Sequence, residues 1–88
     1  MKIKPGYMLR KVVDIFVIIG IGDENYAPSQ IMSLNETGAF LWRILENGAE
    51  RDQLVESLTR EYDVDAQTAA ADVDAFLNSL RERSLIAE

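Results

Sequence analysis

SLNETGAFLW, residues 33–42, is the stretch in which the chain changes from strand-forming to helix-forming sequence. Asn35 is a favourable N-cap residue, and Glu36 complements the positive end of a helix. Ser33 with Glu36 also matches a capping box, which leaves the helix start open by about two residues. Gly38 then falls in the first turn, where it costs up to about 1 kcal/mol relative to alanine. We therefore expect another part of the backbone to pack closely against Gly38, either the sheet or a later helix.

The residues before this stretch are typical of β-structure. The segment MLRKVVD (8–14) is rich in β-branched and apolar residues, and IFVIIGIG (15–22) is a dense apolar run of strand length. GDENYAPS (22–29) is typical of a turn or loop, and QIMSL (30–34) predicts a third, brief strand. Short connections favour an antiparallel meander with the second strand in the middle and the third at an edge.

The residues after this stretch have apolar side chains at helical spacing. We predict three helices, over residues 36–45, 51–62 and 66–83. Asn47-Gly48 is expected to end the first helix, and Asp65 to cap the third.

The order of these elements predicts the fold class. Leu85 and Ile86 form a short apolar tail that is expected to fold back on the core. No linker or repeat divides residues 1–88, so we expect a single domain. The order β-β-β-α-α-α predicts an α+β fold of winged-helix type, with a three-stranded antiparallel sheet followed by three helices.

The composition argues against an enzyme. The chain contains no histidine and no cysteine, which removes the usual general base, metal ligand and strong nucleophile. We therefore expect no catalysis, no metal and no cofactor. The longest apolar run, Ile15 to Ile21, is far shorter than the roughly 20 residues of a membrane helix, and the first residues do not resemble a signal peptide. These features predict a soluble, cytoplasmic protein.

A winged-helix outline raises the possibility of DNA binding through the third helix. Residues 34–88 hold five Lys/Arg and twelve Asp/Glu, whereas residues 1–33 hold four and three. The third helix presents Asp72 and Asp74 before its first basic residue, Arg81. Because phosphate contacts require Lys and Arg, the charge disfavours a nucleic-acid partner.

The third strand predicts protein binding, because an edge strand has unpaired N–H and C=O groups along one side. QIMSL (30–34) carries no charge that would block pairing. The edge can accept a peptide strand, pair with a second copy in a homodimer, or be covered by a loop. The residues alone leave these alternatives open.

Four motifs in this order resemble the PqqD family, named for a pyrroloquinoline quinone biosynthesis protein. They are Leu34-Asn35, Leu41-Trp42, Tyr62-Asp63-Val64-Asp65, and Asp72-Val73 followed by Phe76-Leu77 and Leu80. The resemblance extends over residues 7–86. The chain departs from the family pattern at Glu50, where a small capping hydroxyl is common, and at Ser84, where glycine is common. Both departures concern helix ends.

The resemblance implies a non-catalytic peptide chaperone of natural product biosynthesis. Such RiPP recognition elements bind the leader of a ribosomally synthesised precursor peptide and present it to a modifying enzyme, often a radical SAM enzyme. The leader adds as a strand to the third strand and lies in the groove beside the third helix. The residues expected to take part are the strand backbone of Gln30, Ile31, Met32, Ser33 and Leu34, and the helix stripe Asp72, Phe76, Ser79 and Arg83.

Individual positions in this stripe have separate expectations. Asp72 or Arg83 would set the polarity of the bound peptide, and the acidic surface would favour basic residues in the leader. Phe76 fits a role in the core equally well. Gly38 is expected to support the groove without touching the peptide.

Overall fold

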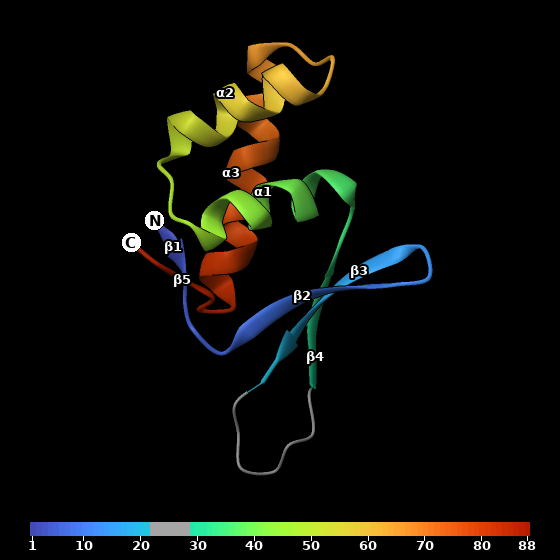
Figure 1. Ribbon diagram of the computed structural model, residues 1–88. Helices are drawn as coiled ribbons and strands as arrows, with labels where there is room; N and C mark the ends of the chain where they lie inside the picture. Colours follow the sequence, from blue (N-terminus) through green and yellow to red (C-terminus); the bar gives the residue numbers. More distant parts are fainter. Residues whose placement is uncertain (22–28) are drawn as a thin grey trace.

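The computed structural model describes residues 1–21 and 29–88, and most of the predicted turn over 22–29 lies outside the described residues. Within them, a three-stranded sheet projects from a cluster of three helices (Figure 1). The helix bounds lie within one residue of those predicted, which confirms the α+β, winged-helix-like fold. The elements are β1 (Lys2–Ile3), β2 (Tyr7–Val12), β3 (Ile15–Gly20), β4 (Ser29–Leu34), α1 (Glu36–Glu46), α2 (Arg51–Glu61), α3 (Ala66–Glu82) and β5 (Ile86–Ala87).

The main sheet has the strand order β2-β3-β4, and both pairings are antiparallel. The predicted meander is therefore confirmed, with β3 in the middle and β4 at an edge. The pairing of β3 with β4 is irregular at one point. Met32 lies opposite Ile18 and Gln30 lies opposite Ile19, so Ile31 is an extra residue without a partner in β3. This is a β-bulge, which bends and twists the strand that contains it.

The core lies between the helices and one face of the sheet. Val17 and Ile18 of β3 are buried, which explains why the central strand is a dense apolar run. Trp42 of α1 is fully buried and belongs to the same hydrophobic cluster as Ile18. The other fully buried large side chains come mainly from the helices; they are Leu41, Leu45, Leu54, Leu58, Val73, Leu77, Leu80 and Leu85.

Asn35 is the residue that begins α1. Its side-chain oxygen accepts a hydrogen bond of 2.8 Å from the Gly38 N–H, which satisfies one of the free donors of the first turn. The alternative capping box with Ser33 is wrong, because Ser33 is still paired with Val17 in the sheet. Asp65 caps α3 as predicted, accepting from the Thr68 N–H at 2.7 Å.

Gly38 is buried where α1 leaves the sheet. A Cβ atom built on it would lie 3.1 Å from Asn35 Oδ1 and 3.3 Å from Leu34 Cβ. The closest neighbours are thus the last residue of β4 and the cap of the same helix, whereas α3 supplies none of the three nearest atoms. Of the two predicted neighbours of Gly38, the sheet and a later helix, the sheet is the correct one.

The two end segments of residues 1–88 form a small sheet that the sequence did not predict. Lys2 and Ile3 pair antiparallel with Ala87 and Ile86. The chain reaches this position because Ser84, just after the C-cap of α3, has a φ of 59°, and the Leu85 N–H donates to the Leu80 carbonyl at 2.9 Å. The apolar tail folds back on the core as predicted, and Leu85 is fully buried.

Candidate functional site

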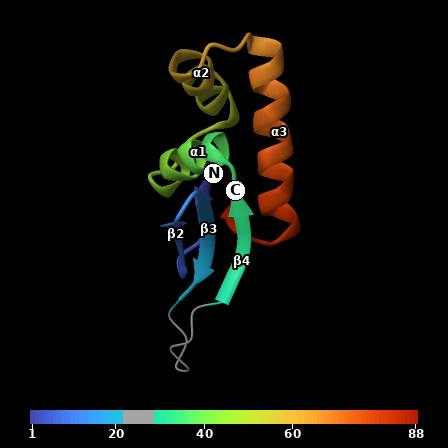
Figure 2. The same cartoon turned by 90° about the vertical axis from the view of Figure 1, so that its right-hand side faces the viewer.

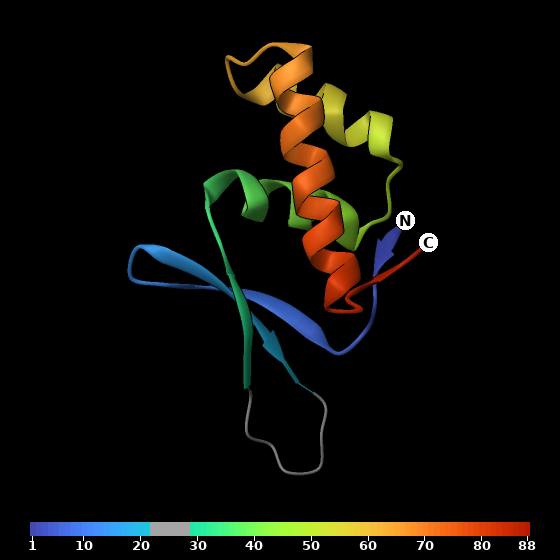
Figure 3. The same ribbon diagram turned by 180° about the vertical axis from the view of Figure 1, so that it is seen from behind.

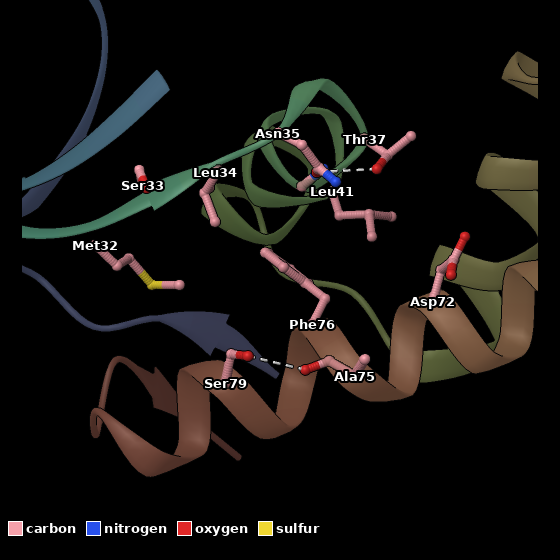
Figure 4. Close-up of a pocket in the computed structure, with 11 residues that line it drawn as sticks. Met32, Ser33, Leu34, Asn35, Thr37, Leu41, Asp72, Ala75, Phe76 and Ser79 are labelled. Carbon is pink, nitrogen blue, oxygen red and sulfur yellow. Dashed lines mark hydrogen bonds between the residues drawn. The ribbon is translucent and has the colours of Figure 1, made fainter. Parts of the chain in front are cut away.

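A groove of about 320 Å³ lies between β4 and α3 and is closed at one end by the start of α1 (Figure 4). Figure 2 shows β2, β3, β4 and α3 following one another across the view, and Figure 3 shows α3 beside β4 from behind. Because β4 pairs only with β3 among the described residues, its other edge faces this groove. The lining residues are Met32, Ser33, Leu34, Asn35, Thr37, Gly38, Leu41, Asp72, Ala75, Phe76 and Ser79.

The interior of the groove is largely apolar. Met32 and Leu34 come from β4, Leu41 from α1 and Phe76 from α3. Figure 4 shows the Phe76 ring pointing from α3 toward α1 and β4. Phe76 is only 9 % exposed and belongs to the core cluster while also lining the groove. Phe76 therefore belongs both to the core and to the groove, and these two predicted roles do not exclude each other.

Six of the nine residues expected at the site line the groove. Met32, Ser33 and Leu34 form its strand wall, and α3 contributes the other three, Asp72, Phe76 and Ser79. Gly38 is expected from the sequence to support the groove without touching the peptide, but it also belongs to the groove lining.

Arg83 lies beyond the end of the groove, near the other two predicted residues, Gln30 and Ile31. It is the C-cap residue of α3, and its Nη1 donates a hydrogen bond of 3.1 Å to the carbonyl oxygen of Ile31. Ile31 is also the bulged residue of β4. The helix stripe therefore contacts the edge strand directly at this point, which the sequence did not predict.

The two acidic residues in the middle of α3 have different surroundings. Asp74 receives two hydrogen bonds from the Arg51 guanidinium, at 2.6 and 3.0 Å, and this contact holds the pKa of Asp74 below its usual value. It ties α3 to α2. Asp72 lines the groove and takes part in no salt bridge within residues 1–21 and 29–88. Asp72 can therefore interact with a ligand without breaking any salt bridge of the described residues.

A second hollow, of about 580 Å³, lies between the β2–β3 hairpin and the helices. Lys11 Nζ and Arg43 Cζ lie 5.7 and 5.5 Å from the centre of the Phe16 ring, so two cations lie close to one aromatic ring. At its other side, burial and then the charges of Glu36 and Glu61 raise the pKa of Tyr62. The sequence did not predict this hollow, since its residues come from distant segments.

The described residues contain no buried polar or charged side chain and no group of three His, Cys, Asp or Glu placed to hold a metal ion. No helix in this part of the chain is long and apolar enough to cross a membrane. What the site presents is a free strand edge beside an apolar groove, which suits the binding of an extended peptide.

Comparison with known proteins supports this interpretation. The sequence model of the family described as "Coenzyme PQQ synthesis protein D (PqqD)" matches residues 17–86. The chain belongs to the PqqD family. The resemblance carried by the four motifs is thereby confirmed, and the matched range includes both walls of the groove. Comparison with curated proteins gave no match.

Two solved structures share the fold of this PqqD-family chain. One is described as TbiB1 in complex with the TbiA(β) leader peptide; it is 25% identical, with a TM-score of 0.72 over 100% of both chains. The other is described as lasso peptide synthetase B1 complexed with the leader peptide; it is 23% identical, with a TM-score of 0.70 over 99% of this chain and 96% of that chain.

Proposed function

We propose that this PqqD-family protein is a non-catalytic module that binds the leader segment of a ribosomally synthesised precursor peptide. The observation that carries the proposal is the free edge of β4 beside the apolar groove. An extended peptide can pair its backbone with such an edge while its side chains enter the groove. The structures described as complexes with leader peptides support the same role.

The proposed binding site combines backbone and side-chain contacts. The β4 backbone supplies hydrogen bonds, which give affinity without reading sequence. Phe76 and its apolar neighbours receive alternate side chains of the peptide and fix its register. Asp72 is free to attract a basic residue of the leader. The full proposed set is Gln30, Ile31, Met32, Ser33, Leu34, Asp72, Phe76, Ser79 and Arg83.

The partner in this proposal is a modifying enzyme, to which the module presents the bound leader. We propose a radical SAM enzyme, on the basis of the family resemblance. The test is to co-express the protein with a radical SAM enzyme and a precursor peptide encoded beside its gene. Peptide modification that requires both proteins supports this assignment, and modification by the enzyme alone contradicts it.

The binding function itself is tested with peptides. Fluorescent peptides that tile the precursor encoded beside the gene are titrated with the protein, and anisotropy is measured. Saturable binding confined to leader peptides, with none to scrambled peptides of equal composition, supports the proposal. Equal binding of scrambled and native peptides contradicts it.

The same free edge also favours a second candidate, a homodimer joined through β4. In that case the groove would be occupied by the partner copy. Sedimentation and the peptide titration together separate leader binding from self-association. A dimer that persists in dilute solution and binds no leader peptide favours self-association.

A further inference from the structure

The edge of β4 has two halves with different structures. In the half that ends at α1, Met32, Ser33 and Leu34 pair regularly with β3 and line the groove. In the other half the register is interrupted, because Ile31 has no partner in β3. A bulge bends the strand, and a strand that is bent in this way is a poor template for a regular ladder of hydrogen bonds.

Arg83 contacts the edge of β4 at Ile31, the bulged residue. Its guanidinium donates to the Ile31 carbonyl at 3.1 Å, so it occupies an acceptor that an added strand would otherwise use. Bulges and charged side chains are two of the means by which proteins protect a free edge from unwanted pairing. Here both converge on one residue of an otherwise uncharged strand.

We propose that Arg83 is a specificity-determining residue that, together with the bulge at Ile31, closes the Ser29–Ile31 half of β4 to strand addition. The leader then pairs only with Met32–Leu34, which fixes its register in the groove. This inference rests on the proposed function and narrows the pairing segment within it. The same closure keeps β4 from pairing with β4 of a second copy.

The Arg83 side chain is suited to closing the edge selectively. It is exposed and begins at the end of α3, so it screens the edge without filling the groove. An exposed hydrogen bond of this kind contributes little to stability, so its removal should leave the fold intact. The effect of a substitution can therefore be assigned to pairing at the edge.

The experiment compares Arg83→Met with the wild-type protein. Methionine keeps much of the length of the side chain and removes every strong donor. Arg83→Lys restores a donor and a positive charge, and Arg60→Met is the matched control, because it removes an exposed guanidinium from α2. Self-association is measured by sedimentation velocity. Contacts between β4 and peptides tiling the precursor are measured by intermolecular NOEs.

We expect peptide contacts to reach Met32 in the wild-type protein and to extend to Ile31 or Gln30 in Arg83→Met. Affinity should rise about two- to fivefold, the size of an exposed charged contact. Arg83→Met should also self-associate more readily than Arg60→Met, and Arg83→Lys should behave like the wild type.

Two results would overturn the inference. Contacts that already reach Gln30 in the wild-type protein show that this half of the edge is open. If Arg83→Met matches Arg60→Met in both measurements, Arg83 does not close it. If no peptide binds either protein, the proposed function fails, and sedimentation alone then decides whether Arg83 protects the edge.

Discussion

Leu34 and Gly38 pack so closely that a Cβ atom on Gly38 would lie 3.3 Å from Leu34 Cβ. Leu34 is the last residue of the edge strand, and Gly38 lies in the first turn of α1. Both residues line the groove. The absence of a side chain at one position therefore sets how the proposed peptide-pairing strand meets the helix that closes the groove.

A larger side chain at Gly38 should disturb this junction. We expect Gly38→Val to lower the free energy of unfolding by about 1–3 kcal/mol, because its methyl groups would press on Leu34 and the Asn35 cap. Urea denaturation measures the loss. Ala71→Val is the control, since Ala71 is exposed on α3 and this change should cost only about 0.5 kcal/mol of helix propensity. Equal, small losses in both variants would show that Gly38 is not sterically required.

Filling the groove should weaken peptide binding without unfolding the protein. Ala75 is exposed on α3 and lines the groove, so we expect Ala75→Trp to weaken leader binding at least about tenfold, in keeping with a side chain that blocks a central contact. Ala71 lies one turn earlier on α3 and is outside the groove lining, so Ala71→Trp should bind like the wild type. Anisotropy titration compares the two. If they bind equally well, the groove is not the site.

The structure explains why glycine is common in the family at the position of Ser84. Its φ of 59° lies in the left-handed region, where glycine is favoured over other residues. Ser84→Gly should therefore raise the free energy of unfolding by about 0.5–1 kcal/mol. Gly48→Ala provides the converse test, because Gly48 has a φ of 89° and should lose stability when substituted. Chemical denaturation of both variants checks these signs, and a destabilised Ser84→Gly protein would contradict the account.

Asp65 should make stability depend on pH. The hydrogen bond from the Thr68 N–H holds the pKa of Asp65 below its usual value. The folded state therefore favours the ionised carboxylate. Its contribution to stability is fully present above the unfolded pKa of about 3.9, and it is lost as pH falls through the folded pKa. In Asp65→Asn the cap oxygen remains but cannot titrate.

The measurement is urea denaturation of wild-type and Asp65→Asn proteins between about pH 6 and pH 2.5. We expect the wild type to lose stability relative to Asp65→Asn as pH falls below about 4. A stability difference that stays constant across this range would show that the Asp65 carboxylate does not contribute through its charge.

Local chemistry made most of the fold predictable from the sequence. Asn35 and Asp65 begin helices because their side chains accept backbone hydrogen bonds only three residues away. The dense apolar run that contains Val17 and Ile18 identifies a central strand, since it has strand length and its middle residues are buried. The strand order then gave a free edge on β4, and with it the side of the molecule where the groove lies.

The features that the sequence did not reveal depend on contacts between distant residues. Lys2 and Ile3 pair with a strand at the opposite end of the chain, and two residues are too few to show a period. The bulge at Ile31 depends on the register with β3, and the hydrogen bond to Arg83 joins residues 52 positions apart. Helical spacing predicted that Arg83 lies on the stripe with Phe76, but it could not show what the Arg83 guanidinium contacts.

The most direct test of the central claim is an NMR titration of the isotope-labelled protein with a leader peptide that binds it. We predict that the largest amide shifts occur at Met32–Leu34 and along α3 from Asp72 to Ser79, in a complex of one protein and one peptide. Shifts confined to the second hollow around Phe16, with β4 and α3 unchanged, would contradict the claim that the leader binds between β4 and α3.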